Sequence, residues 1–327
     1  MEQGELPHAG YQVLSFLQKQ WFLIGIACAA SLGYLFPEWG NIVRSYDVIS
    51  IGIFLAFFST GLCLETRSIL RQVGNLRAPL AAATSSLILY PVIAWLLALP
   101  VLPYEYVLGI CILGTGPVTV SSGTIMTAIA RGNVPLSILI CILTSFIAIF
   151  TIPVMLDILL SVGSDIEFPV LQMFMGLVLK VLVPIVLGQI LRPLCKHTIK
   201  RYEHQLSIFQ SCIIILIIFN VVNRSAPHIG QAGTALIGVA LFVAFLHFFM
   251  LLVNYWIAHL IRLDPPSVIA FTIHTSQKTL AVSYIVWAGH FAQQYPMAFI
   301  PAIICQLVQM AVGTSVARYF RERHEQI

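Results

Sequence analysis

The sequence predicts an all-α integral membrane protein with ten transmembrane helices. Composition, the spacing of apolar stretches and the distribution of positive charges all favour this class. Of the 327 residues, 59% are hydrophobic and only 9% are charged, whereas charged residues make up roughly 25% of an ordinary soluble domain. The mean hydropathy is +0.92. These values exclude a soluble globular protein.

Ten apolar stretches are long enough to cross roughly 30 Å of hydrocarbon. The second and seventh are short for a span, and the fourth and ninth contain polar segments. In chain order, the predicted spans are 21–37, 49–64, 78–99, 105–130, 134–160, 169–191, 207–222, 234–262, 266–289 and 296–318.

The N-terminal segment 1–20 lacks a positively charged region and a small-residue cleavage site, so we expect no signal peptide before the first span. The seven cysteines have no repeated spacing, which gives no indication of disulfides or of a zinc site. We therefore expect the cysteines to serve as small packing residues, and we expect no cofactor and no metal centre.

Lysine and arginine residues predict the orientation, because positive residues in short loops stay on the cytoplasmic side. With ten spans, Arg44 and Arg224 lie on the outer side and thirteen basic residues lie on the inner side. Both termini, including the tail 319–327, are then cytoplasmic. The inner set is Lys19, Arg67, Arg71, Arg77, Arg131, Arg192, Lys196, Lys200, Arg201, Arg262, Arg318, Arg321 and Arg323.

Two similar segments indicate an internal repeat. The segment 32–37 (Leu-Gly-Tyr-Leu-Phe-Pro) closes the first span, and 187–193 (Leu-Gly-Gln-Ile-Leu-Arg-Pro) closes the sixth. Their offset is close to the one that separates the two polar segments. Five helices in each half would make the second half enter the membrane from the opposite side. We predict inverted repeats over 21–160 and 169–318, joined by an outer loop at 161–168.

The polar segment of the fourth predicted span, 114–124, reads Gly-Thr-Gly-Pro-Val-Thr-Val-Ser-Ser-Gly-Thr. Glycine and proline allow the backbone to leave the α-helix. Hydrocarbon offers the freed polar groups no partners, so such a segment is expected to line a cavity or a site. Its candidate binding hydroxyls are Ser121, Ser122, Thr124 and Thr127. The alternative is that these small residues support close helix packing.

The polar segment of the ninth predicted span, 274–279, reads His-Thr-Ser-Gln-Lys-Thr. A lysine at mid-membrane costs about 3 kcal/mol on insertion scales, and no Asp or Glu lies in the central part of any predicted span. Lys278 could pair with an anionic substrate, a bound anion or a helix C-terminus, or it could be neutral and carry a proton. The candidate binding residues here are His274, Ser276, Gln277, Lys278 and Thr279.

Lys180, in the sixth predicted span, could line the same cavity or extend along a neighbouring helix. An isolated histidine in apolar sequence usually serves as a hydrogen-bonded packing residue, and this applies to His247 and His274.

Four segments carry a resemblance to a known family. They are 61–64 with the basic stretch up to Pro79, 91–97, 117–123 continuing to 131–133, and 276–281. At these residues, and over nearly the whole chain, the sequence resembles the bile acid:sodium symporter family, in particular the branch that includes member 7 of solute carrier family 10. The resemblance implies a panel domain (spans 1, 2, 6 and 7) and a core domain in which discontinuous helices 4 and 9 cross. It also implies a substrate site between the domains and alternating access.

The sequence departs from the sodium sites that the resemblance implies. The family's Ser-Asn pair matches Gly123 and Thr124, and its glutamate on the ninth helix matches Ile273. Of two hydroxyl positions on the fifth helix, Ser137 keeps the hydroxyl and Cys141 lacks it. We therefore hypothesise that the ammonium of Lys278 occupies or neutralises the space that sodium fills in the relatives.

The functional expectation is a secondary active transporter of a small organic anion that lacks the two sodium sites. The alternatives are a sodium- or proton-coupled symporter or antiporter of another solute, and a regulator of calcium entry that does not transport. No catalytic motif indicates an enzyme, and no basic patch with interleaved aromatic residues indicates nucleic-acid binding. We expect a multi-pass protein of the plasma membrane or the bacterial inner membrane.

Overall fold

The computed structural model describes residues 8–64, 76–119, 122–161 and 169–325. These residues form helices joined by short connections, with no strand among them. The helices in the first half are α1 His8–Leu35, α2 Pro37–Ser45, α3 Val48–Cys63, α5 Arg77–Thr84, η1 Ser85–Leu89, α6 Tyr90–Ala98, α7 Tyr104–Thr115, α8 Ser122–Ile129 and α9 Val134–Ser161. Those in the second half are α10 Val170–Leu177, η2 Val178–Leu182, α11 Val183–Ala232, α12 Ala235–Leu260, α13 Pro265–Thr275, α14 Leu280–His290, η3 Pro296–Phe299 and α15 Ile300–Glu325.

Five of the described helical stretches are long and apolar enough to cross a membrane, and a sixth is added if the bent pair Gln20–Leu35 and Glu38–Ser45 counts as one span. The chain is thus a multi-pass membrane protein. The five are Arg77–Ala98, Val134–Ser161, Val170–Ala232, Ala235–Leu260 and Pro296–Arg323. The predicted fourth and ninth spans are each divided into two shorter helices, so neither reaches this length. The count of ten spans stays a prediction.

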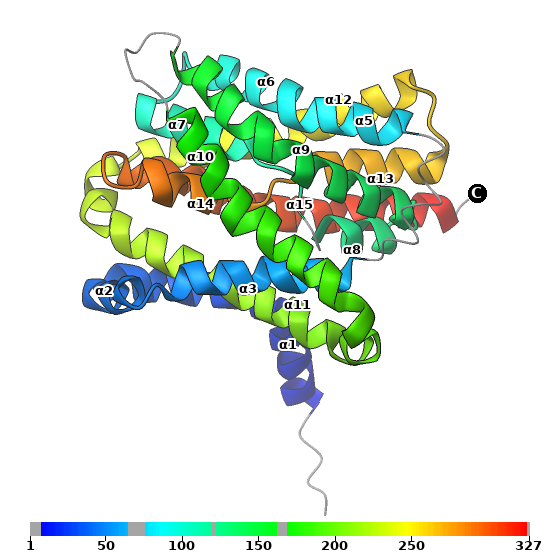
Figure 1. Cartoon of the computed structure of the whole chain (residues 1–327), viewed down its shortest axis with the longest axis horizontal. Helices are drawn as coiled ribbons and strands as arrows, with labels where there is room; N and C mark the ends of the chain where they lie inside the picture. Colours follow the sequence, from blue (N-terminus) through cyan, green and yellow to red (C-terminus); the bar gives the residue numbers. More distant parts are fainter. Residues whose placement is uncertain (1–7, 65–75, 120–121, 162–168, 326–327) are drawn as a thin grey trace, which may run out of the picture.

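The predicted sixth and seventh spans lie in one continuous stretch of helix, which corrects the separation expected between them. Gln189 donates to the carbonyls of Gly61 (2.5 Å) and Leu64 (3.0 Å), while Gln210 donates to Ser59 Oγ (2.9 Å) and Thr60 Oγ1 (3.1 Å). The two glutamines would be roughly 30 Å apart on a straight helix, yet both contact the same end of α3. The helix therefore bends back on itself between them, as Figure 1 shows at the lower right.

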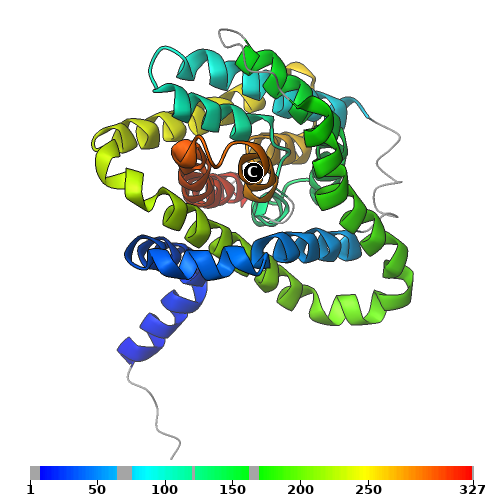
Figure 2. The ribbon, with the colours of Figure 1, turned by 60° about the vertical axis from the view of Figure 1, so that its left-hand side comes forward.

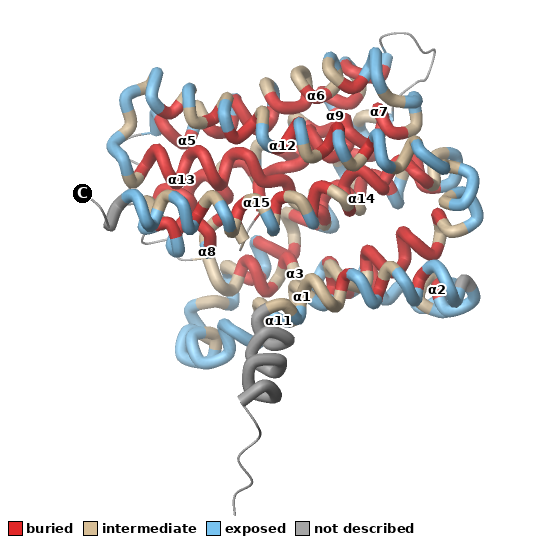
Figure 3. The backbone as a smooth tube through the Cα atoms, turned by 180° about the vertical axis from the view of Figure 1, so that it is seen from behind, coloured by how far each residue is buried: buried red, intermediate tan, exposed pale blue. Residues whose placement is uncertain are grey.

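The helices form two layers. In Figures 1 and 2, α1, α2 and α3 lie together with much of α11, and the other helices form a larger body beside them. Buried residues concentrate in that larger body, around α7, α13 and α15 (Figure 3). The larger body therefore contains most of the core.

Glycines permit the closest helix contacts in the smaller layer. A Cβ added to Gly33 would lie 2.6 Å from the carbonyl oxygen of Phe219, and one added to Gly188 would lie 2.3 Å from that of Phe58. Real side chains do not reach such distances, so both contacts require glycine. Both glycines belong to the similar segments that close the predicted first and sixth spans.

The segments predicted outside the spans are only partly described. Helix α1 begins at His8, inside the segment 1–20, and α15 continues to Glu325, inside the tail 319–327. Residues 1–7, residues 326–327, most of the outer loop 161–168, and Ser121 lie outside the described residues. The division into two repeats stays a prediction.

Candidate functional site

The two polar segments interrupt their helices and contact each other. Helix α7 ends at Thr115, and Gly116 is extended, with ψ at 152°. Helix α13 ends at Thr275, and α14 begins after Thr279, whose ψ is 125°. The backbone N–H of Thr279 donates to the carbonyl of Pro117 at 3.0 Å. The two interruptions thus share a hydrogen bond between backbone groups that a continuous helix would have paired internally.

Lys278 is buried, with 1% of its surface exposed, and its Nζ has several partners within the protein. Its Nζ donates to Ser86 O (2.5 Å), Ser86 Oγ (2.9 Å) and Gly116 O (2.9 Å), and it lies 4.4 Å from the ring centre of Tyr90. An ammonium has three N–H donors, so all three are used. Gly116 directly follows the C-terminus of α7, where the helix dipole favours a positive charge.

The backbone of Lys278 is held by one side chain of α15. Gln309 Oε1 accepts from the N–H of Lys278 at 3.0 Å, and Gln309 Nε2 donates to its carbonyl at 3.0 Å. Gln309 is itself fully buried. The position of the lysine is therefore fixed at both its backbone and its ammonium group.

His274 links three elements. Its Nε2 lies 2.7 Å from the carbonyl of Thr119, and its Nδ1 pairs with Ser137 Oγ, which also lies 3.3 Å from Thr124 Oγ1. Because a carbonyl can only accept, Nε2 carries the proton and Nδ1 accepts from Ser137 when the ring is neutral. A Cβ added to Gly123 would lie 2.6 Å from the ring, so the glycine makes room for the imidazole.

Gln277 fastens α8 to the break before α14. Its Oε1 accepts from Thr119 Oγ1 and from Ser122 Oγ, each at 3.0 Å, and its Nε2 donates to the sulfur of Met126 at 2.8 Å. Thr119 Oγ1 in turn accepts from the N–H of Gly123 at 3.1 Å. The side chain of Thr119 thereby caps the N-terminus of α8.

Two other predicted hydroxyls are also bonded internally. Ser276 Oγ donates to the carbonyl of Thr272 at 2.8 Å and accepts from Asn254 Nδ2 at 2.8 Å. Thr127 Oγ1 donates to the carbonyl of Gly123 at 2.7 Å. Both side chains are buried, and neither lines a cavity described here.

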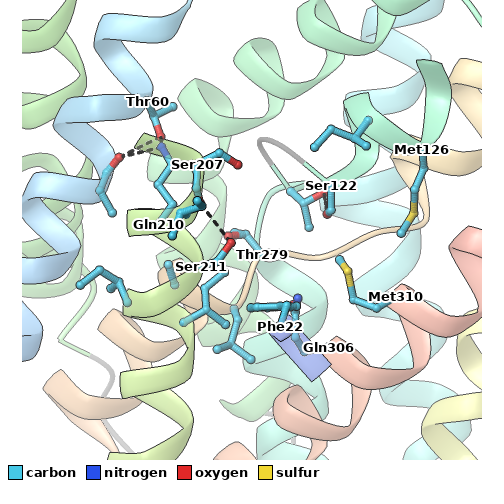
Figure 4. Close-up of a pocket in the computed structure, with 18 of the residues that line it drawn as sticks. Phe22, Thr60, Ser122, Met126, Ser207, Gln210, Ser211, Thr279, Gln306 and Met310 are labelled. Carbon is cyan, nitrogen blue, oxygen red and sulfur yellow. Dashed lines mark hydrogen bonds between the residues drawn. The ribbon is translucent and has the colours of Figure 1, made fainter. Parts of the chain in front are cut away.

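A cavity of about 330 Å³ lies between the two layers, and we call it the interface cavity. Hydroxyl and amide groups line it from both sides (Figure 4). The smaller layer contributes Thr60, Ser207, Gln210 and Ser211, and the larger body contributes Thr119, Ser122, Thr279, Gln306 and Thr314. Such groups can bind an anion or a neutral polar solute.

The predicted site residues that the structure describes separate into four groups. Ser122 and Thr279 line the interface cavity, and Thr124 lines a neighbouring cavity of about 670 Å³ together with Lys200 and Arg201. Lys180 lines a different pocket, described below. The buried group behind the interface cavity is Thr127, Ser137, His274, Ser276, Gln277 and Lys278.

Sequence reasoning missed the lining from the smaller layer. Gln210 was the available signal, since an amide side chain in the otherwise apolar span 207–222 needs a partner. Its neighbours Ser207 and Ser211 lie on the same face, because residues three and four apart are adjacent on a helix.

A third pocket, of about 280 Å³, lies between α2, α3, α11 and α14, and we call it the basic pocket. Its charged lining residues are Arg44, Asp47, Lys180 and Arg224. Of the alternatives for Lys180, the structure therefore favours a cavity position, but in a different cavity from the one next to Ser122 and Thr279.

The profile of the SBF-like CPA transporter family (DUF4137) matches residues 20–322. The chain belongs to the SBF-like CPA transporter family. Members of this family are transporters and not enzymes, so the buried Ser, His and Lys side chains belong to a transport protein. Among the described residues, no group of three His, Cys, Asp or Glu side chains could hold a metal ion.

Relatives of this SBF-like protein cover most of its length. It is 26% identical to sodium/bile acid cotransporter 7 of Mus musculus over 93% of each chain. It is 23% identical to the probable chloroplastic sodium/metabolite cotransporter BASS4 of Oryza sativa subsp. japonica, over 97% of this chain and 79% of the relative. Both names agree with the family resemblance found in the sequence.

Proposed function

We propose that this protein is a secondary active transporter that carries a small organic anion by alternating access, and that it works without sodium. The observation that carries the proposal is the fixed ammonium of Lys278 at the meeting point of two interrupted helices. In this proposal the interrupted helices are the crossing helices 4 and 9 of a ten-span fold with two inverted repeats.

The electrostatics of the interrupted helices favour an anion. Ser122 and Thr279, which line the interface cavity, stand at the N-termini of α8 and α14. A helix N-terminus carries a partial positive charge. The side chain of Thr279 does not cap the N-terminus of α14, and the backbone N–H groups of this first turn would suit an anion. The opposite partial charge, at the end of α7, is already compensated by Lys278.

The residues at the sodium positions implied by the resemblance support sodium independence. Ile273 stands where a glutamate is expected, and it packs against Met126, Ala130 and Ile269. The ring of His274 fills the space between Gly123 and Ser137. An imidazole thus occupies part of the region, and no carboxylate is available among its described residues to compensate two added cations.

The cavities along the layer interface support alternating access. On α3, Ser50 and Ile53 line the basic pocket while Ala56 and Thr60 line the interface cavity. Helices α11 and α14 also line both cavities, the interface cavity with their earlier residues and the basic pocket with their later ones. About one helical turn separates the two linings on α3, so a small rocking of one layer against the other could close one cavity and open its counterpart.

Uptake into proteoliposomes tests the proposal. An organic anion is first selected by its ability to raise the melting temperature of the purified protein, because a ligand that binds only the folded state stabilises it. Counterflow of that labelled anion is then measured with sodium replaced by choline at fixed pH. We expect the same rate in both media. A strict requirement for sodium would refute sodium independence.

Sodium coupling is the second candidate, and the printed names of the relatives favour it. The choline experiment decides between the two. A regulator that does not transport would show no counterflow of any ligand that stabilises it.

A further inference from the structure

The basic pocket gathers positive charge where the predicted topology has almost none. Three cationic side chains line it, Arg44, Lys180 and Arg224, against the single carboxylate of Asp47. Arg44 and Arg224 are the two basic residues predicted on the outer side. They come from α2 and α11, which are far apart in the sequence, so the fold itself brings them together.

The partners of the two arginines are neutral groups. Arg44 donates to Asn223 Oδ1 at 3.1 Å and to Asn41 Oδ1 at 2.6 Å, which are neutral amides. Arg224 lies over the ring of Trp287, 5.8 Å from its centre. Arg44 and Arg224 line the same pocket, so their like charges repel each other. A bound anion would relieve this repulsion.

A buried amide at the same pocket lacks a partner. Asn220 lines the basic pocket and is 1% exposed. Its Oδ1 accepts from the hydroxyl of Tyr284 at 3.2 Å, whereas its Nδ2 has no hydrogen-bond acceptor among the described residues. A buried donor without an acceptor costs about 1–3 kcal/mol, and an oxyanion in the pocket would supply the missing acceptor.

We propose that the basic pocket is an outer binding site for the oxyanion group of a small free solute, a carboxylate, sulfate or phosphate. This inference rests on the proposed function, and it identifies the oxyanion group as the part of the transported anion that the protein binds first. The planar guanidinium forks of Arg44 and Arg224 match two oxygens of such a group, and Asn220 Nδ2 donates to it. A volume of about 280 Å³, near the lower limit of roughly 300 Å³ for ligand sites, fits a small solute.

Titration of the full chain in an uncharged detergent tests the site. Potassium sulfate and potassium phosphate are titrated against the purified protein by calorimetry, with chloride keeping the ionic strength constant. We expect R44Q/R224Q to bind sulfate at least roughly 30-fold more weakly than the unaltered protein, because each charge-assisted pair contributes about a factor of ten. R318Q/R321Q removes the same charge from exposed positions of α15, and we expect no change.

K180Q provides a second variant, because Lys180 is exposed and its replacement leaves the packed core intact. We expect K180Q to weaken sulfate binding severalfold. Sulfate affinity that is equal in R44Q/R224Q, K180Q and the unaltered protein overturns the site, as does no binding at all. Binding of phosphatidylglycerol vesicles but not of sulfate assigns the pocket to lipid headgroups and also overturns it.

The same experiments separate this inference from the proposed function. If the unaltered protein carries out counterflow but shows no arginine-dependent sulfate binding, the outer site is refuted and the transport proposal stands. If sulfate binds in an arginine-dependent manner while no anion undergoes counterflow, the transport proposal fails and the site remains.

Discussion

Lys278 illustrates how a charge can be kept at the centre of a membrane protein. Its ammonium has two carbonyls, a hydroxyl and an aromatic face as partners, and none of them is a carboxylate. Carbonyls at a helix C-terminus and the face of an aromatic ring both attract cations. The side chain of Lys278 therefore joins the end of α7 to the break before α14.

Replacement of Lys278 by methionine tests this role. K278M keeps an apolar stem of similar length but leaves the carbonyls of Ser86 and Gly116 without their donor. We expect K278M to lose counterflow and to be less stable by about 1–3 kcal/mol for each unsatisfied acceptor. Thermal unfolding in detergent measures the second effect. K196M, at an exposed position of α11, is the control, and normal counterflow by K278M would remove the lysine from the mechanism.

At this scale, the residues that the sequence singled out come mostly from the core side of the candidate site and not from the opposite side. A lysine and a glutamine within apolar sequence are costly, so the sequence alone indicated Gln277 and Lys278 as candidate binding residues. Single residues such as Thr60 carry no such cost, because a hydroxyl in a helix can donate to its own backbone, as Thr60 does to Ala56 at 3.0 Å.

At the scale of helices, the interruptions were predictable and the continuity of α11 was not. Glycine, proline and polar residues at depth each disfavour a continuous apolar helix. The connection between the sixth and seventh predicted spans instead contains Lys196, Lys200, Arg201 and Glu203, which are all good helix formers. The polar character of this segment predicted that the chain turns back outside the membrane, but it did not predict whether the turn is a loop or a bent helix.

Helix α11 also contains a matched pair of glycines that tests its contact with α3. A valine at Gly188 would place its Cβ 2.3 Å from the carbonyl oxygen of Phe58, whereas no atom lies within 4 Å of a Cβ added at Gly230. We expect G188V to separate the two helices, lower the melting temperature by several degrees and abolish counterflow.

G230V changes helix propensity in the same helix without a clash, and we expect it to retain most of its activity. Equal melting temperatures for G188V and G230V would contradict the close α3–α11 contact. The similar position of Gly33 against Phe219 predicts the same behaviour for G33V, as an inverted repeat would require.

At the scale of the whole molecule, composition and charge predicted a multi-pass α-helical protein, and the apolar helices and the family match agree with this. The packing of α11 against α3 within the smaller layer could not be read from the sequence, because it depends on contacts such as that of Gln210 with Thr60, between residues about 150 positions apart.

Accessibility of single cysteines tests both the topology and the alternating-access proposal. In a background in which the seven native cysteines are replaced, S211C reports on the interface cavity and S50C on the basic pocket. Reference positions are Lys196, predicted inside, and His228, predicted outside, both of which are exposed. A membrane-impermeant maleimide added from the outside should label S50C and H228C but not K196C.

The interface cavity and the neighbouring cavity share Thr60, His204 and Gln210. The neighbouring cavity is also lined by Lys200 and Arg201, which are both predicted on the inner side. We therefore expect both cavities to open toward the inner side. S211C should therefore be labelled from the inside in this conformation. If a transported anion makes one layer rock against the other, its addition should change the labelling of S211C and of S50C in opposite directions. Labelling of S211C and S50C from the same side, with no opposite response to substrate, would contradict alternating access at this interface.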